Sequence, residues 1–184
     1  KAQLEQAITE WAPDHVGPNE PLTIYLMDHG GAERFYLDGV NGEWVTPTEL
    51  DSWLSELEST IPGVETNIIY EACESGSFIS QPQSISGERR LVMTSTGEWS
   101  LAYASQKGAI FSDSFIDALA QGMNLEAAFF EAALAVNSVH PDQDPWLDDN
   151  GDGHYTSADG QIAARRAFAC TAPPAQQLWA PYIE

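Results

Sequence analysis

The stretch that decides the fold is Ile68-Ile69-Tyr70-Glu71-Ala72-Cys73-Glu74-Ser75-Gly76-Ser77-Phe78. Its first three residues are β-branched or aromatic and lie between turn-forming residues, which predicts a short buried strand. The strand delivers Cys73 to its carboxyl end, and the small polar residues after it allow the chain to turn. In open α/β sheets, ligands bind beyond the carboxyl ends of the strands. The sequence therefore places a thiol where chemistry is usually done.

A histidine follows a second predicted strand, Leu22–Met27, and lies in Asp28-His29-Gly30-Gly31. A histidine and a cysteine at two strand ends are the parts of a Cys/His nucleophilic site. A free thiol with a pKa of about 8.5 is only partly ionised at neutral pH, so an imidazole is needed to take its proton and later protonate the leaving amine. The backbone N–H groups of Gly30 and Cys73 could form an oxyanion hole.

Each motif by itself has a plainer explanation. A lone cysteine at the end of an apolar strand is most often a small buried hydrophobe, and a lone His-Gly-Gly is most often a turn. The presence of both motifs, each at a strand end, favours catalysis.

The two motifs, D-H-G at 28–30 and E-A-C-E-S-G at 71–76, resemble the legumain (asparaginyl endopeptidase) family of caspase-like cysteine peptidases. The resemblance implies a caspase-like three-layer α/β fold, with a mostly parallel sheet between helices, over roughly residues 1–140. It also implies a His29/Cys73 dyad and cleavage of peptide bonds. An acyl-enzyme can be resolved by an amine instead of water, so a ligase side activity is possible as well.

The same resemblance implies three substrate-binding residues. Glu71 matches the glutamate that lines the primary pocket of the family, and Ser95 and Asp113 stand where the family places further pocket residues. An acidic pocket can accept asparagine through its amide donors or a basic side chain through charge pairing. Both preferences stay open at this point, and asparagine is favoured.

Composition sets the outer limits. The 184 residues, 43% of them hydrophobic, can bury a full core, and we expect residues 1–184 to be part of one peptidase domain. A formal charge of −21 argues against nucleic-acid binding, and no apolar run approaches a membrane span. Such acidity maintains solubility and suits a salty or calcium-rich medium. We expect a secreted or cell-surface protein. A nucleophilic Cys73 cannot be in a disulfide, so Cys170 is expected to be a buried free thiol.

Strands and helices are predicted to alternate along the chain, which is typical of a parallel sheet covered on both faces. A Thr46-Pro47-Thr48-Glu49 capping box begins one helix, which ends before Pro62-Gly63. A later helix, rich in Ala and Phe, is expected to be largely buried. The predicted elements are a helix over about 2–12, strands 22–27, 68–70 and 90–95, a hairpin of 35–37 with 43–45, and helices 47–61, 112–119 and 124–136.

A third motif lies at residues 148–159, where D-x-N-x-D-G is followed by an acid at the twelfth position. This is the spacing of an EF-hand or dockerin-type calcium loop. The predicted calcium ligands are the side chains of Asp148, Asn150, Asp152 and Asp159 and the carbonyl of His154. The alternative is an acidic surface turn. The ion would be structural, and a helix is expected to follow over 162–168.

Only one helix is predicted before Pro21, whereas the caspase-like fold places about two strands before the histidine strand. We therefore expect the first strands to lie on a preceding segment or a separate chain, a fragment of the same precursor released by self-processing. The alternative function is a catalytically inactive, calcium-stabilised protein-binding module whose His/Cys pair is vestigial.

Overall fold

A four-stranded sheet lies at the centre of the computed structural model, which describes residues 1–80, 82–106 and 108–168. Its strands lie in the order β1 (Leu22–Met27), β5 (Thr66–Glu71), β6 (Arg90–Thr94) and β7 (Trp146–Asp148). The first three are parallel, and β7 is antiparallel to β6. The predicted, mostly parallel sheet is confirmed. The strand β7 was not predicted, because three residues are too few to show a period.

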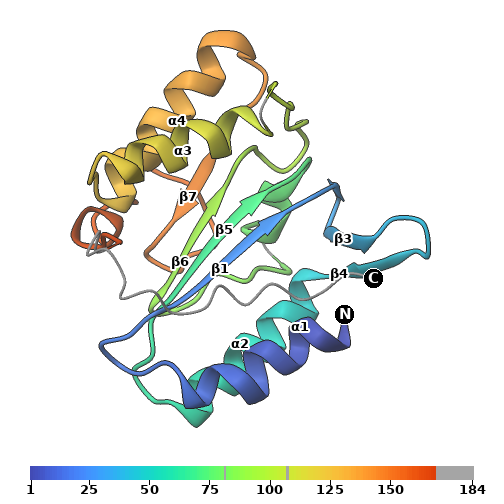
Figure 1. Cartoon of the computed structure of the whole chain (residues 1–184), viewed down its shortest axis with the longest axis vertical. Coiled ribbons are helices and arrows are strands. Elements are labelled where there is room, and N and C mark those ends of the chain that lie inside the picture. Colours follow the sequence, from blue (N-terminus) through green and yellow to red (C-terminus); the bar gives the residue numbers. More distant parts are fainter. Residues whose placement is uncertain (81, 107, 169–184) are drawn as a thin grey trace.

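Helices cover both faces of this sheet (Figure 1). α1 (Ala2–Gln6) and α2 (Pro47–Thr60) lie on one face, and α3 (Ile110–Ala120) and α4 (Leu125–Val139) lie on the other. All six residues of β5 are buried, so its alternate side chains enter different cores. Ile68 packs in the core under α2, and Ile69 packs in the core under α3 and α4. The protein is therefore a three-layer α/β structure.

The helices on the first face form for the reasons predicted. At the start of α2, the Glu49 N–H donates to Thr46 Oγ1 over 3.3 Å, and the Thr46 N–H donates to the Glu49 carboxylate over 3.0 Å. This is the expected capping box. The first helix continues from α1 through a π-helical turn, η1 (Ala7–Trp11), into a 3-10 turn, η2 (Ala12–Asp14). Its apolar face is held by buried Ile8.

A small second sheet follows His29 directly. It contains β2 (Gly30–Gly31), β3 (Arg34–Asp38) and β4 (Glu43–Val45), all antiparallel, and so confirms the predicted hairpin. Phe35 and Val45 are buried in the core under α2. The hairpin is thereby anchored, and it holds the chain just after β1.

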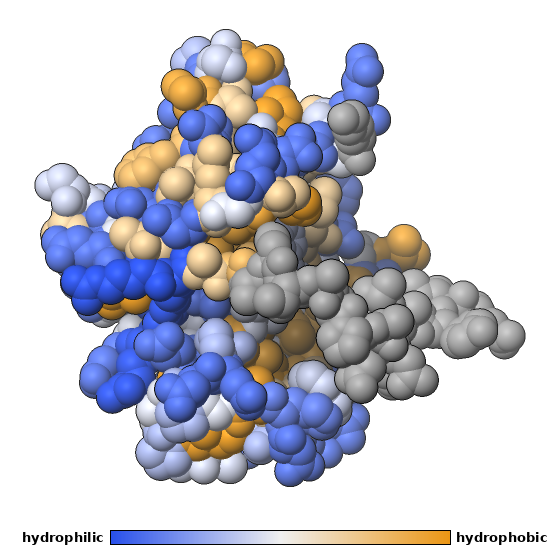
Figure 2. Space-filling view, turned by 60° about the vertical axis from the view of Figure 1, so that its left-hand side comes forward, coloured by the Kyte–Doolittle hydropathy of each residue, from blue (hydrophilic) through white to orange (hydrophobic). Residues whose placement is uncertain are grey.

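The expectation that α4 is largely buried is wrong. Phe130, Leu134 and Val139 are 49%, 66% and 61% exposed, so only one face of the helix is packed. Figure 2, in which the left-hand side of Figure 1 is turned forward, shows hydrophobic residues among hydrophilic ones in the upper half of that face. Composition predicted burial of the whole helix, whereas a helix against a single sheet face buries one stripe.

The expected helix over 162–168 is also wrong. Within the described residues, this part of the chain forms only a 3-10 turn, η4 (Ala163–Arg165). The Asp149 carboxylate accepts the backbone N–H groups of Ile162 and Ala163 over 2.7 and 2.8 Å, which ties the start of the segment to the preceding loop. Cys170 lies outside the described residues. Over the ranges described, no helix is both long and apolar enough to cross a membrane.

Candidate active site

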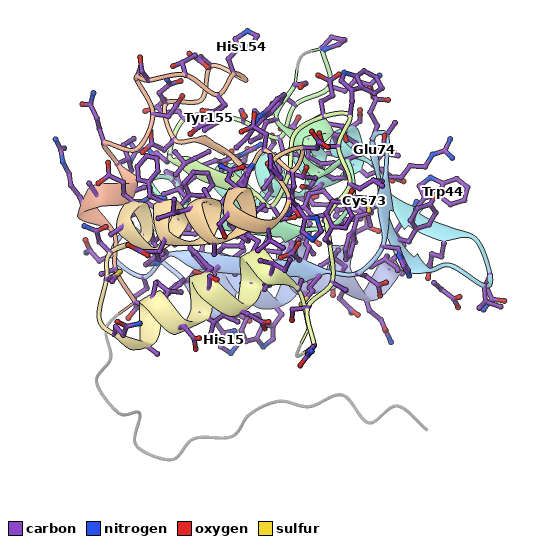
Figure 3. All side chains as sticks on the ribbon, turned by 90° about the horizontal axis from the view of Figure 1, so that it is seen from above. His15, Trp44, Cys73, Glu74, His154 and Tyr155 are labelled. Atoms are coloured by element: carbon purple, nitrogen blue, oxygen red, sulfur yellow. The ribbon has the colours of Figure 1, made fainter. Side chains whose placement is uncertain are left out.

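Cys73 lies at a sharp turn two residues beyond β5. Glu74, the next residue, has left-handed backbone angles (φ 55°, ψ 24°) and precedes the 3-10 helix η3 (Ser75–Phe78). A non-glycine residue in this conformation costs free energy and is found where the surrounding structure enforces it, often at functional sites. We name residues 72–75 the Cys73 turn. Cys73 is partly exposed, and it lies toward the end of the molecule that carries Trp44 of the hairpin (Figure 3).

His29 is brought level with Cys73 by the pairing of β1 with β5. Met27 lies opposite Glu71, and the Asp28 N–H extends the pairing by donating to the Glu71 carbonyl over 3.3 Å. Two residues beyond the paired ends, His29 and Cys73 therefore follow neighbouring strands at the same height. Neighbouring strands are about 4.8 Å apart. The tertiary structure thus brings together the two backbone positions that the sequence predicted.

Gly30 packs directly against the Cys73 turn. A Cβ atom built on Gly30 would lie 2.5 Å from the Cys73 carbonyl oxygen and 2.8 Å from the Ala72 Cβ. No side chain fits there without moving backbone. The glycine that was predicted for its N–H group is therefore also needed for close packing between the two turns.

The other three histidines are placed differently. His15 stacks on Trp11 on the first helix, and Figure 3 shows both His15 and His154 apart from Cys73. His140 stacks on Tyr103, with ring centroids 3.8 Å apart. His29 is therefore the histidine that the strand register aligns with the thiol.

Glu71 is buried at the end of β5, with 3% of its surface exposed. Its Oε2 accepts the N–H of Ser112 over 2.9 Å and the Ser112 hydroxyl over 2.8 Å. Among the described residues, Oε1 has no hydrogen-bond partner. Burial raises the pKa of Glu71, the negative charge of Asp113 adds to the rise, and the nearby hydroxyls of Ser95 and Ser112 oppose it. Ser95 Oγ, which lies near this carboxyl group, is likewise buried and makes no hydrogen bond within the described residues.

The three predicted substrate-binding residues, Glu71, Ser95 and Asp113, come together around this carboxyl group. Two further members of this cluster, Tyr25 and Ser112, were not predicted from the sequence. The Tyr25 hydroxyl donates to Ser112 Oγ over 2.7 Å, and burial raises the pKa of Tyr25 to about 12, with the charges of Glu71 and Asp113 adding to the rise. Tyr25 lies on the less buried face of β1, but no sequence signal pairs it with Ser112.

The loop at 148–159 is ordered by its own backbone. The two carboxylate oxygens of Asp148 accept the N–H groups of Gly151 and Gly153 over 2.8 and 2.7 Å. Asp159 accepts the Thr156 N–H over 2.7 Å, and burial raises its pKa, with the negative charge of Asp148 adding to the rise. In the part of the chain that the structure describes, no three His, Cys, Asp or Glu side chains form a group that could hold a metal ion. The calcium site stays a prediction.

Comparisons with known proteins place this arrangement in a family. The sequence profile of the peptidase C13 family matches residues 14–139, more than half of the chain. No curated protein matches the sequence. The structure is similar to caspase-1 from Spodoptera frugiperda, with a TM-score of 0.61 and 14% identity over 80% of this chain and 67% of that chain. At such low identity the likeness shows the fold alone, a caspase-like α/β fold. The chain belongs to the peptidase C13 family and is a caspase-like cysteine peptidase of the legumain type.

Proposed function

We propose that the protein is an endopeptidase in which Cys73 is the nucleophile and His29 is the general base. The thiol gives its proton to His29 as the sulfur attacks the substrate carbonyl carbon. His29 then protonates the leaving amine, and water hydrolyses the thioester. The backbone N–H groups of Gly30 and Cys73 would stabilise the oxyanion. The register of β1 on β5, which sets His29 level with Cys73, carries this proposal.

We further propose that the cluster around Glu71 binds the side chain before the scissile bond. A buried carboxylate oxygen without a partner supports this role, because the amide N–H₂ of a substrate asparagine would satisfy it. Lysine or arginine would satisfy it through charge. We favour asparagine, because Oε2 of Glu71 already accepts two neutral donors, the N–H and the hydroxyl of Ser112.

A fluorogenic peptide panel that varies the residue before the cut tests both proposals. Cys73→Ala and His29→Ala should each lower kcat/KM by at least about a thousandfold. His15→Ala is the matched control, because that histidine is exposed and apart from Cys73 (Figure 3). Retention of a tenth of wild-type turnover in either active-site variant would contradict the dyad. Equal labelling of wild type and Cys73→Ala by a thiol-reactive peptide probe would favour an inactive binding module.

The open edge of β1 supports a proposal about a partner. Among the described residues, β1 pairs only with β5, so its other edge presents unpaired backbone groups. Such an edge favours pairing with a further strand. We propose that an N-terminal segment of the same precursor adds that strand and is separated by self-cleavage. Intact mass of a longer precursor decides this: identical cutting in wild type and Cys73→Ala rules out self-processing.

We also propose that the 148–159 loop binds calcium as a structural ion. The D-x-N-x-D-G spacing with Asp159 at the twelfth position supports a cation there, because it supplies several oxygen ligands from one short loop. The remaining oxygens would be those of Asn150, Asp152 and the His154 carbonyl. A calcium-dependent fold would suit the expected secreted or cell-surface location.

A further inference from the structure

A buried glutamine lies on the connector between α4 and β7. Gln143 has 0% of its surface exposed. Its Oε1 accepts the N–H of Tyr103 over 3.1 Å, and its Nε2 donates to the carbonyl of Ser95 over 2.8 Å. One side-chain amide therefore joins the two ends of residues 95–103, which we name the 95–103 segment.

The 95–103 segment also contacts the Cys73 turn. The carbonyl of Ser100 accepts the N–H of Glu74, the left-handed residue, over 2.8 Å. The carbonyl of Ala102 accepts a hydrogen bond from the Cys73 thiol, with Sγ 3.7 Å away. Two carbonyl groups between the points held by Gln143 therefore touch the thiol and the residue after it.

The same connector contacts the segment a second time. His140, which caps the end of α4, stacks on the Tyr103 ring with centroids 3.8 Å apart and planes inclined by 7°. Tyr103 is thus held by its backbone N–H and by its ring. This double contact fixes the end of the 95–103 segment next to Ala102.

We propose that Gln143 is a positioning residue that sets the 95–103 segment, and through it the Cys73 thiol, for attack on the substrate. The proposal rests on the proposed role of Cys73 as the nucleophile. An amide suits this place because it donates and accepts while staying neutral. Loss of these bonds leaves the buried Ser95 carbonyl and the partly buried Tyr103 N–H without a protein partner, which favours movement of the segment. Displacement of reacting atoms by about 1 Å can cost about a hundredfold in rate.

Two substitutions separate the hydrogen bonds from the packing. Gln143→Glu keeps the acceptor and, when ionised, loses the donor, whereas Gln143→Met keeps the length and loses both. Asn124 provides a matched control, because its amide also joins two backbone groups: it donates to the Ala164 carbonyl over 3.0 Å and accepts the Ala127 N–H over 2.8 Å. It lies at the other end of α4, about 22 Å away along a helix of 15 residues. Asn124→Asp and Asn124→Leu are the corresponding variants.

Amide hydrogen exchange gives a readout that needs no catalysis. We expect the Glu74 amide to exchange at least about tenfold faster in both Gln143 variants, while the Leu54 amide of α2 changes much less. A purely global loss of stability would speed both amides alike. In peptide cleavage, kcat should fall at least about tenfold with a smaller change in KM. The Asn124 variants should leave the Glu74 amide and kcat near wild type.

Several results would overturn the proposal. One is a pair of folded Gln143 variants with Glu74 exchange and kcat within about twofold of wild type. Another is an equal effect in the Asn124 variants. If neither Gln143 variant folds, His140→Ala decides, because it removes only the ring on Tyr103 and should shift both readouts in the same direction by less. An inactive wild type would refute the proposed function, and the exchange experiment would still decide the positioning.

Discussion

Gly30 and Cys73 are in such close contact that a Cβ on Gly30 would lie 2.5 Å from the Cys73 carbonyl oxygen. This distance is shorter than any normal contact between these atoms, so the turn after β1 and the turn after β5 can meet only if residue 30 has no side chain. The contact joins the histidine side of the proposed dyad to the cysteine side.

Gly30→Ala should therefore lower kcat/KM by at least about a hundredfold, because the added methyl group pushes the two turns apart. The Gly30 N–H is retained in this variant, so the loss reports displacement. Peptide cleavage and thermal unfolding measure it. Gly39→Ala is the control, since a Cβ there meets nothing within 4 Å. Activity of Gly30→Ala within threefold of the control would show that the contact is not needed.

Glu71→Gln should change the pH dependence of stability. The folded-state pKa of Glu71 is raised, mainly by burial, so the folded protein holds this proton more tightly than the unfolded chain. The contribution of Glu71 to stability is therefore full below its unfolded pKa of about 4.3 and is lost as pH rises through the folded pKa. The melting temperature of Glu71→Gln should therefore rise relative to that of wild type as the pH is raised above about 4.3.

Glu71→Gln should also cleave peptides more slowly, because an amide N–H₂ group replaces one carboxylate oxygen or turns Oε1 away from the substrate. Exposed Glu56→Gln on α2 serves as the control for a lost charge. A melting-temperature difference that does not change with pH would contradict the buried, proton-linked role of Glu71.

Arg90 ties β6 to α2 from a buried position. It is 3% exposed and pairs with Asp51 and Glu58, each over 2.6 Å. Removing one member of a buried ion pair is strongly destabilising, and the partial exposure of both acids moderates the cost. Arg90→Met should lower the free energy of unfolding by roughly 3 kcal/mol in denaturant titrations.

Arg89→Met is the control for Arg90. Arg89 is about half exposed and its contact with Glu88 is 3.7 Å long, so its loss should cost less than about 1 kcal/mol. Equal effects of the two substitutions would mean that the Arg90 cluster contributes no more than a surface pair.

Calcium chelation should lower the melting temperature of the wild type, because an ion that binds only the folded loop stabilises it by mass action. Asp148→Asn with Asp152→Asn should remove this response. Asparagine removes the charge and keeps one of the two oxygens with which Asp148 accepts the loop N–H groups, so the change in melting temperature on adding EDTA is compared within each variant. Asp142→Asn, outside the loop, should respond like wild type. If EDTA leaves the wild-type melting curve unchanged and no metal copurifies, the loop is an acidic turn held by its own hydrogen bonds.

The sequence by itself determined the elements whose causes are local. The strands β1, β5 and β6 are short runs of apolar residues bounded by turn formers, and α2 begins at a capping box, so each could be located without its neighbours. His29 and Cys73 could be predicted as a pair because both follow such strands, and parallel strands end at one edge of a sheet.

Only the tertiary structure decided which side chains meet. Glu71 bonds Ser112 across 41 residues and Tyr25 bonds Ser112 across 87, while Gln143 reaches across 40 and 48 residues to hold Tyr103 and Ser95. Glu71 stands in the 71–76 motif, but Tyr25, Ser112 and Gln143 stand in none, and a hydrogen bond between distant segments leaves no period in the sequence. The failed prediction of a helix after the 148–159 loop has the same cause, because Arg166 is extended and held by distant residues: its carbonyl accepts the Leu125 N–H over 2.8 Å and its guanidinium donates to Asn67 over 2.7 Å. Local patterns fix local backbone, whereas long-range polar contacts depend on how the layers pack.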